Sequence, residues 1–343
     1  MIENDTLMAA ELREAPEVVS RQSLLLRPSL EELSNFLFAR PPQVVVTCAR
    51  GSSAHAANFG KYLIERYLGI PVSAAAPSIA TVYKRRLALE GQLFLVISQS
   101  GRSDDLVEAT LSAREAGART VAIVNDTASP LAAASHIILP MGAGEELSVA
   151  ATKTFIASLS ALLHLVARWT GERSLLDAII RLPVRLDEAL QLDWTAASAQ
   201  LSHARSIATI GRGPTLAIAQ EASLKLKEVC NIHAEAFSGA EFQHGPIALV
   251  SEDFPALIFL PGDAGAIALR VLARDLRRRH ALVYTTSNGP GEGIALPVLA
   301  PECSETDAVC LIPTFYKLVT HLATRRGMNV DAPRHLRKIT RTR

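Results

Sequence analysis

The stretch Gln43-Val-Val-Val-Thr-Cys48, which continues into Ala49-Arg-Gly-Ser-Ser53, decides the fold of this 343-residue chain. A continuous β-branched run of this kind is typical of a strand that is buried on both faces, as in a parallel sheet. A helical pattern follows at 54–67. The alternation continues with a buried run at 93–97 and a helix at 104–115, which predicts a doubly wound parallel α/β sheet.

A second copy of this pattern follows at a constant shift of 162 positions, which is the distance from Arg50 to Arg212. Ser206–Thr215 then falls on Val44–Ser53, and an Arg-Gly pair recurs in both stretches. The same shift carries three further apolar runs, 93–96, 121–124 and the one from Ile137, to runs that begin at Pro255, near Val283 and near Leu299. Four strands in rough register indicate a tandem duplication rather than two unrelated α/β domains.

The elements outside the two sheets set the expected domain limits. We predict helices between Asp5 and about Arg40, and a link between the domains within 171–200. The limits are then 1–30 for an N-terminal helical segment, 31–185 and 186–330 for the two domains, and 331–343 for a C-terminal tail. Pro333 disfavours a continuing helix, so the tail is expected to leave the second domain as a loop.

The composition is that of a globular protein without a nucleic-acid or membrane partner. Apolar residues make up 49% of the chain, enough for buried cores, and the net charge is only +1. The longest apolar run, about Phe155 to Val166, is too short to span a bilayer, and the acidic N-terminus has no signal-peptide core. The four cysteines match no zinc spacing. We therefore expect no metal and a reducing, cytoplasmic setting.

The stretch from Glu221 to Pro246 carries the first chemical signal. Its first half favours helix, and Glu221, Lys225 and Glu228 at i, i+4 and i+7 share one face of it. Its second half breaks the helical pattern and places His244 on a loop. Carboxylate, amine and imidazole are the groups that move protons on a sugar carbon. The alternative is a solvated helix face with an ordinary ion pair.

Hydroxyl side chains follow the first two predicted strands. They are Ser52 and Ser53 after the first strand, and Ser98, Ser100 and Ser103 around Gly101 after the second. Open α/β sheets bind ligands at the carboxyl ends of their strands, where hydroxyls and free N–H groups suit an anion such as phosphate. No dinucleotide-binding fingerprint or P-loop is present, which favours a phosphate monoester. Alternatively, these serines only cap helices.

Taken together, these features resemble the sugar-isomerase (SIS) domain family. The most similar branch is the isomerase half of the glucosamine-6-phosphate synthases, the glutamine–fructose-6-phosphate aminotransferases. The resemblance covers nearly the whole chain and implies two tandem SIS domains, each a parallel, flavodoxin-like sheet flanked by helices. It rests on motifs in the family's order: Gly51–Ser53, Ser98–Gly101, Val149–Phe155, Leu224–Glu228, Ile232–Ala236, His244–Pro246 and Pro333–Lys338.

The resemblance also implies roles for single residues. Glu228 matches the base that moves a proton between C1 and C2, and Glu221 and Lys225 match supporting residues. His244 matches the ring-opening acid or base, which the neighbouring subunit of a homodimer contributes, and Lys338 matches the lysine that forms an imine with the open-chain ketose. The residues that match phosphate-binding and other substrate-binding positions are Ser53, Ser98, Gln99, Ser100 and Ser103, and Val149, Ala150 and Ala151.

The chain also departs from the synthases. They begin with a nucleophilic Cys after the initiator Met, whereas this sequence has Ile2 and only a short lead-in, so we expect that glutamine does not supply ammonia within this polypeptide. Ala151 stands where the synthases have a substrate-contacting serine, and Arg102 replaces a usual Glu in the phosphate loop.

The expected function is therefore an amino-sugar-phosphate deaminase/isomerase that converts glucosamine 6-phosphate into fructose 6-phosphate and ammonia without a cofactor. Alternatives with similar chemistry are ammonia-dependent synthesis in the reverse direction, a fructosamine-phosphate deglycase and a galactosamine-phosphate deaminase. The alternative of another class is a sugar-phosphate-binding regulator. Such SIS regulators usually carry a helix-turn-helix module, and no basic DNA-binding helix is apparent before residue 40.

Overall fold

The computed structural model describes residues 6–289 and 291–338, which form two compact units. One, here called the first unit, comprises Glu17–Glu146, Lys153–Ile180 and the residues from Arg337 on. The other, the second unit, comprises the residues up to Pro16 together with Leu147–Thr152 and Arg181–Leu336. The domain limits expected from the sequence stay a prediction.

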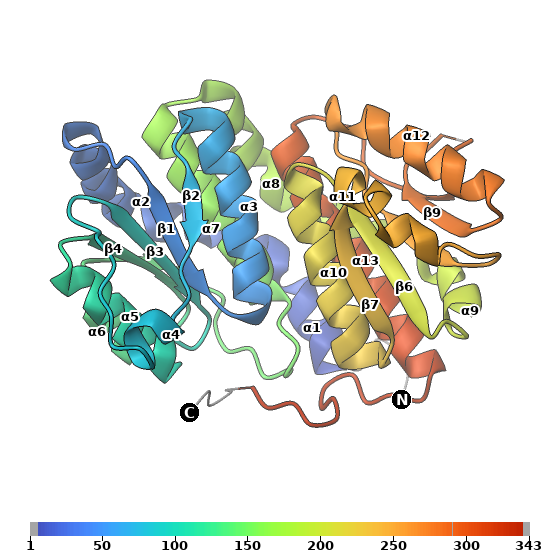
Figure 1. The fold of residues 1–343 in the computed structure, drawn as a ribbon, viewed down its shortest axis with the longest axis horizontal. Coiled ribbons are helices and arrows are strands. Elements are labelled where there is room, and N and C mark those ends of the chain that lie inside the picture. Colours follow the sequence, from blue (N-terminus) through green and yellow to red (C-terminus); the bar gives the residue numbers. More distant parts are fainter. Residues whose placement is uncertain (1–5, 290, 339–343) are drawn as a thin grey trace. The chain divides into compact units, whose positions relative to one another are not determined.

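A five-stranded parallel sheet forms the centre of the first unit, in the order β2-β1-β3-β4-β5 (Figure 1). This is the flavodoxin-like order, so the predicted fold class is confirmed for this half. The strands are β1 (Val45–Ala49), β2 (Val72–Ala74), β3 (Leu93–Ser98), β4 (Arg119–Val124) and β5 (Ile137–Pro140). Sequence patterning predicted all of them except the edge strand β2, whose three residues are too few to show a pattern.

Both faces of this sheet are covered by helices. Alternate residues of the central strands, such as Val96 and Ala122, pack against α5 (Asp104–Glu115) and α6 (Pro130–Ala134) on one face. On the other face α3 (Gly51–Leu68) lies against β1 and β3 and packs on the almost wholly buried α7 (Lys153–Thr170). The helix α2 (Ala15–Ala39) is fixed to α7 by a hydrogen bond from the Gln22 amide to the Ala157 carbonyl, 2.9 Å.

The second unit repeats this architecture. Its sheet has the order β10-β9-β8-β6-β7, which is the same topology strand for strand, and all of its pairs are parallel. The strands are β6 (Ser206–Gly211), β7 (His233–Ser238), β8 (Pro255–Ile258), β9 (Leu282–Thr286) and β10 (Ile294–Leu296). The shift of 162 places β1, β3 and β4 on β6, β8 and β9, as predicted.

The last strand departs from that register. The expected run at Leu299 lies beyond β10, which ends at Leu296. The reason is the connection before it: β4 and β5 are joined through α6, whereas the described residues between β9 and β10 contain no helix. The shorter connection brings the edge strand forward in the sequence, so a single shift cannot place it.

Helices again cover both faces of the second sheet. Phe242 of α11 (Gly239–Gln243) and Leu269 and Leu276 of α12 (Gly265–Arg278) pack on one face. On the other face α10 (Pro214–Cys230) contacts β6 and β7 and packs on α13 (Ser304–Arg325). The short α1 (Leu7–Arg13) contacts α13, and the predicted link is largely the helix α8 (Arg173–Gln191).

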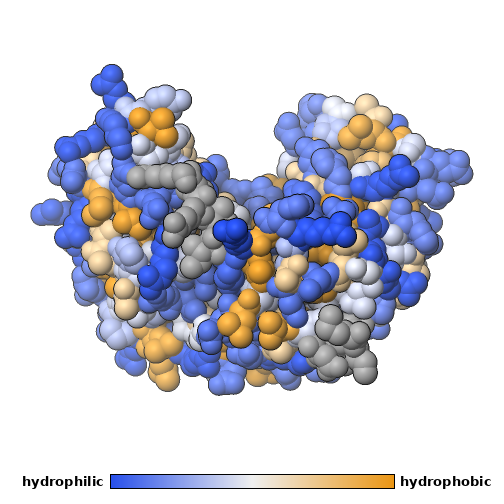
Figure 2. All heavy atoms as spheres, turned by 90° about the horizontal axis from the view of Figure 1, so that it is seen from below, coloured by the Kyte–Doolittle hydropathy of each residue, from blue (hydrophilic) through white to orange (hydrophobic). Residues whose placement is uncertain are grey.

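Apolar side chains on the surface are dispersed. Figure 2 shows one face of the molecule, on which hydrophilic residues dominate and apolar ones form small separate patches. None of the helices in the described part of the chain has the length and apolar character that crossing a bilayer requires.

Candidate active site

The predicted phosphate-binding residues lie at the carboxyl ends of β1 and β3 in the first unit. Ser52 and Ser53 are in the first turn of α3, directly after Gly51, whose φ of 53° is in the left-handed region. Ser98 ends β3, and Gln99 and Ser100 follow it. Because the two strands are neighbours in register, both groups of side chains lie at the same edge of the sheet.

The serine side chains of the loop after β3 accept hydrogen bonds from the backbone of the same loop. The Gly101 N–H donates to the Ser98 hydroxyl oxygen (3.2 Å), and the Arg102 N–H donates to that of Ser100 (3.3 Å). Ser103 occupies the N-cap position of α5, but its side chain makes no capping hydrogen bond. The interpretation that these serines only cap helices therefore fails for Ser103, whose half-buried hydroxyl is not used by the helix.

Two arginines flank this loop, and each is paired. Arg50 contacts the buried Asp105 carboxylate through Nη2 at 2.8 Å and Nε at 3.1 Å. Arg102 contacts Asp126 at 2.7 Å, and both arginine side chains are 53% exposed. The aspartates balance the charge of both arginines, so the hydroxyl and amide groups are the direct candidates for binding an anion.

A buried ion network surrounds the predicted base in the second unit. Lys225 Nζ lies 3.2 Å from Glu221 Oε1 and 2.7 Å from Glu228 Oε2. Glu221 and Lys225 are fully buried, whereas 21% of the Glu228 side chain is exposed. Tyr316 of α13 is also fully buried, and its hydroxyl donates to Glu221 Oε1 at 2.9 Å. The alternative interpretation, a solvated helix face with an ordinary ion pair, is therefore excluded, because only the Glu228 end of the network reaches the surface.

The charge state of Lys225 follows from its neighbours. Burial alone would lower the pKa of this ammonium group, but the carboxylates of Glu221 and Glu228 outweigh it and raise the pKa above its ordinary value. Lys225 is therefore a permanent cation. It fixes the position of the Glu228 carboxylate through the 2.7 Å contact.

The segment Val149–Ala151 is held by contacts within the second unit. The Glu11 carboxylate of α1 accepts hydrogen bonds from the Leu147 and Ser148 N–H groups, the latter at 3.2 Å. The Val149 N–H donates to the Asp331 carbonyl at 3.4 Å. Of the three predicted substrate residues, Ala150 is buried and Val149 and Ala151 are half-buried.

Asp331 also fixes the start of α1. Its two carboxylate oxygens accept hydrogen bonds from the Leu7 and Met8 N–H groups, both at 2.9 Å. A carboxylate at a helix N-terminus satisfies donors that the helix itself leaves unpaired. The C-terminal segment is therefore anchored at Asp331, seven residues before Lys338.

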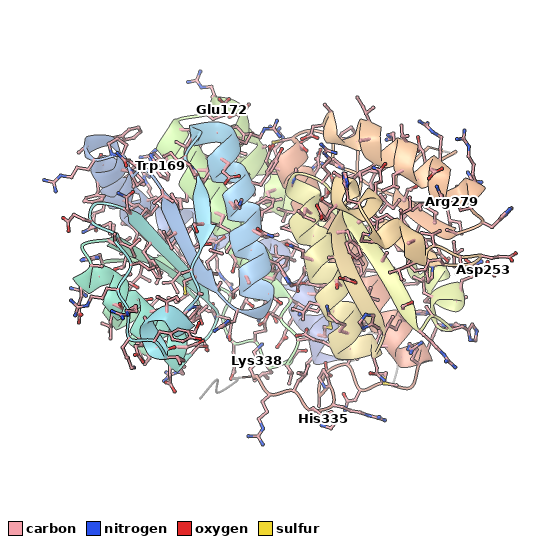
Figure 3. All side chains as sticks on the ribbon, in the orientation of Figure 1. Trp169, Glu172, Asp253, Arg279, His335 and Lys338 are labelled. Carbon is pink, nitrogen blue, oxygen red and sulfur yellow. The ribbon has the colours of Figure 1, made fainter. Side chains whose placement is uncertain are left out.

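The tail lysine is paired with a carboxylate that the sequence analysis did not select. Lys338 Nζ lies 2.8 Å from Oε2 of Glu146, whose side chain is completely buried (Figure 3 labels Lys338). Glu146 also accepts hydrogen bonds from the Thr154 N–H (3.1 Å) and hydroxyl (2.8 Å) at the start of α7. All of these residues belong to the first unit, which also holds the serine loops.

His244 stands apart from these networks. It directly follows α11 and is exposed, in a turn that Gly245 continues with a φ of 143°. The sequence correctly placed it outside regular secondary structure. Its predicted contribution to the site of a neighbouring subunit remains a prediction.

The cysteines offer no nucleophile at the serine loops. Cys48 of β1 is buried, and burial followed by the nearby Asp105 raises the pKa of its thiol to about 12, so it stays protonated at neutral pH.

The structure thus groups the predicted residues by unit. The serines and Lys338 belong to the first unit, and Glu221, Lys225, Glu228, His244 and Val149–Ala151 belong to the second. Sequence reasoning missed Glu146, Tyr316, Glu11 and Asp331. For Glu146, its place just before the Val149–Phe155 motif was the only available signal.

Known proteins match this chain over nearly its whole length. The SIS domain pattern matches residues 40–168 and 200–296. The glutamine–fructose-6-phosphate aminotransferase of Thermotoga maritima is 33% identical over 330 residues, which cover 91% of this chain and 54% of that protein. The chain thus spans about half the length of the curated relatives that it matches.

Solved structures agree with the sequence matches. A protein from Silicibacter pomeroyi, provisionally named a phosphosugar isomerase, is 40% identical with a TM-score of 0.91, covering 95% of this chain and 100% of that one. The C-terminal domain of the glucosamine-fructose-6-phosphate aminotransferase of Francisella tularensis is 27% identical with a TM-score of 0.85, covering 96% and 98%. The resemblance inferred from the motifs is confirmed.

Proposed function

Because the chain belongs to the SIS domain family, we propose that it is a sugar-phosphate isomerase that acts as an amino-sugar-phosphate deaminase. The proposed reaction converts glucosamine 6-phosphate and water into fructose 6-phosphate and ammonia. The observation that carries the proposal is the Glu221–Lys225–Glu228 network, in which a buried cation holds one partly exposed carboxylate in place. The names of the similar proteins, a phosphosugar isomerase and an aminotransferase that acts on fructose 6-phosphate, support the same substrate class.

The phosphate is proposed to bind at the serine loops of the first unit. Ser52 and Ser53 offer hydroxyls at the start of α3. Around the start of α5, Ser98, Ser100 and Ser103 offer hydroxyls and Gln99 offers a side-chain amide. Helix starts favour anions through their free N–H groups and dipole. The Ser103 hydroxyl, which makes no capping hydrogen bond to α5, supports this assignment.

Glu228 is the proposed base for the isomerisation. It removes the proton from C2 of the open-chain aldose and returns it to C1, which converts the C2 amine into a ketose-level imine. Hydrolysis of the imine by water then releases ammonia and leaves the C2 ketone. Lys225 and Glu221 are positioning residues in this scheme, because they fix the Glu228 carboxylate from the buried side.

His244 and Lys338 are assigned the steps around this transfer. His244 is proposed to open the sugar ring, and its exposure is consistent with service in the site of a homodimer partner. Lys338 is proposed to form the imine with the ketose. The Glu146 carboxylate, 2.8 Å from Lys338 Nζ, positions this amine for the proposed step.

The central experiment is an ammonia assay. The purified chain is mixed with millimolar glucosamine 6-phosphate, and ammonia and fructose 6-phosphate are expected to appear in equal amounts. Fructose 6-phosphate with ammonium tests the reverse direction of the same equilibrium, and galactosamine 6-phosphate and fructosamine 6-phosphate test the related reactions. If no turnover of any of these is found, the enzymatic proposal fails. For such an enzyme we propose a cytoplasmic site of action, in keeping with its unpaired cysteines.

Gly101→Ala is expected to weaken phosphate binding. An added Cβ would lie 2.1 Å from the Ser129 hydroxyl oxygen, and φ is +61°. Strain of this kind costs on the order of 1–3 kcal/mol. We expect KM for the sugar phosphate to rise about tenfold, since 1.4 kcal/mol is a factor of ten.

Gly91→Ala is the matched control for this variant. It has a φ of +71° but no atom within 4 Å of the added Cβ, and it lies before β3 rather than after it. It should lose stability without a change in KM. Equal KM values for the two variants would contradict the assignment of the loop.

Tyr316→Phe tests the buried end of the network. The change removes the hydrogen bond to Glu221 and leaves that carboxylate with one donor fewer. We expect kcat to fall severalfold with KM unchanged, because the position of Glu228 and not substrate binding is affected. Tyr284→Phe removes a buried hydroxyl that bonds Gln200 in the same unit, and it should leave kcat intact. A drop of kcat in both variants would indicate a general loss of structure.

A further inference from the structure

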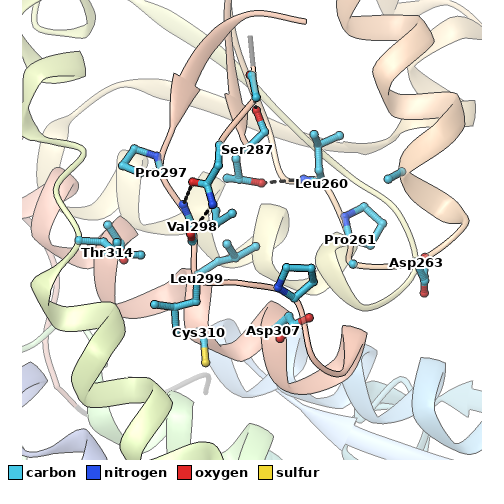
Figure 4. Close-up of a pocket in the computed structure, with 18 of the residues that line it drawn as sticks. Leu260, Pro261, Asp263, Ser287, Pro297, Val298, Leu299, Asp307, Cys310 and Thr314 are labelled. Atoms are coloured by element: carbon cyan, nitrogen blue, oxygen red, sulfur yellow. Dashed lines mark hydrogen bonds between the residues drawn. The ribbon is translucent and has the colours of Figure 1, made fainter. Parts of the chain in front are cut away.

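The second repeat has a pocket of its own at the carboxyl ends of its strands. It has a volume of about 510 Å³, and its lining includes Leu260, Ser287 and Pro297, which follow β8, β9 and β10 (Figure 4). Parallel α/β sheets bind ligands at this edge, and the volume is typical of a small-molecule site. The duplication thus provides a second position at which a ligand can bind.

The loop beside this pocket differs from its counterpart in the first repeat. Leu260-Pro261-Gly262-Asp263 stands where the first repeat has Ser98-Gln99-Ser100-Gly101, so the hydroxyls are gone. Asp263 Oδ1 accepts the Gly265 N–H at 2.8 Å, at the first residue of α12, and Oδ2 accepts the Ser304 hydroxyl at 3.0 Å. The Asp263 carboxylate therefore occupies the N-terminus of α12, which would otherwise attract a phosphate.

The cations that line the pocket are also neutralised. Arg185, with 8% of its side chain exposed, is paired with Asp307 at 2.9 Å and with Glu302 at 3.0 Å. Arg270 is paired with Glu292 at 2.7 Å. Each arginine in the described lining thus has a carboxylate partner. An anionic ligand would have to compete with these carboxylates for the arginines, and it would also meet the Asp263 carboxylate.

The rest of the lining is mostly apolar. Trp194 and Leu311 line the pocket, and Figure 4 places Leu260, Pro261 and Val298 around it. The principal uncharged polar groups are hydroxyls. That of Thr286 accepts the Leu260 N–H at 2.8 Å and keeps its own proton to donate. This combination favours a ligand with an apolar body and a neutral hydrogen-bonding group.

We propose that this pocket is a second small-molecule site, which binds an uncharged, largely apolar compound with a hydrogen-bonding group and discriminates against phosphorylated ligands. The duplicated domain thus keeps the position of the site and changes its chemistry. The proposal is independent of the proposed reaction, because it concerns binding to residues that have no assigned role in catalysis.

Two dyes that share one aromatic frame provide the test. N-phenyl-1-naphthylamine is neutral, and 8-anilino-1-naphthalenesulfonate adds an anionic group. Each is titrated into the full chain and followed by its own fluorescence. We expect one site per chain for the neutral dye, with an affinity at least tenfold higher than that of the sulfonate. Equal affinities, or failure of the neutral dye to bind at a single site, would overturn the proposal.

A pair of variants locates the bound dye. Ile267 and Val271 lie one turn apart on α12 and are both exposed, but only Ile267 lines the pocket. Ile267→Trp should weaken binding of the neutral dye at least tenfold, whereas Val271→Trp should leave it unchanged. The site is wrongly assigned if the two variants bind alike, or if glucosamine 6-phosphate displaces the dye.

Discussion

Glu228→Gln is expected to reduce kcat for glucosamine 6-phosphate by about 1,000-fold, within the range that a positioned general base contributes. The amide cannot accept the C2 proton. The fold should persist, because Lys225 keeps Glu221 as its partner and Glu228 is the partly exposed end of the network. Steady-state ammonia release measures kcat, and isothermal titration with the sugar phosphate measures binding.

The binding measurement separates an enzyme from a sugar-phosphate sensor. The variant should bind the substrate within a few-fold of the wild-type affinity while turnover is lost. Glu252→Gln, the same change on an exposed residue of the second unit, should behave as wild type. Unchanged turnover in Glu228→Gln would show that Glu228 is not the base. A chain that binds sugar phosphates but never turns them over would be a sensor.

Lys225→Met is expected to have the largest effect on stability. The substitution leaves the completely buried Glu221 carboxylate without its cation. Breaking a buried pair from one side costs about 3–5 kcal/mol. The free energy of unfolding, measured by urea denaturation, should fall by this amount, and residual folded protein should have little activity because Glu228 is no longer oriented.

Lys227→Met provides the matched comparison for this result. The residue lies on the same helix two positions away. Within the described part of the chain its ammonium donates to neutral groups, the Ser223 hydroxyl and the Ala234 carbonyl. The same substitution should cost less than about 1.5 kcal/mol there. If the free energy of unfolding fell by a similar amount in the two variants, the Glu221–Lys225 ion pair would not stabilise the fold more than the neutral contacts of Lys227 do.

The sequence was sufficient for the architecture because the central strands are strongly patterned. Runs such as Val45–Cys48 are buried on both faces and so form continuous apolar segments in the sequence. The edge strands β2 and β7 were not predicted by the same rule. β7 alternates exposed and buried residues at its start, His233 exposed and Ala234 buried, and its polar side chains look like a loop. The repeat offset maps β2 onto β7, but neither strand has a pattern that would reveal the other.

The candidate site was predictable where its residues are close in sequence. Glu221, Lys225 and Glu228 share a helix face, so spacing alone joined them. Their partner Tyr316 is 95 positions away from Glu221 on another helix. Glu146 and Lys338 are separated by 192 positions. Such pairings depend on tertiary folding, and no local pattern encodes them.

The anchoring of α1 determines which fragments of this protein can be expected to fold. The helix Leu7–Arg13 belongs to the second unit. Its first N–H groups donate hydrogen bonds to Asp331, and its Glu11 accepts hydrogen bonds from the backbone at Leu147 and Ser148. A fragment cut at the boundary between the repeats would discard this helix along with the first repeat. A circular permutant that joins the two ends of this chain and begins ahead of the second repeat would keep the helix. A fragment taken from that permutant should be more stable than one cut from the original chain.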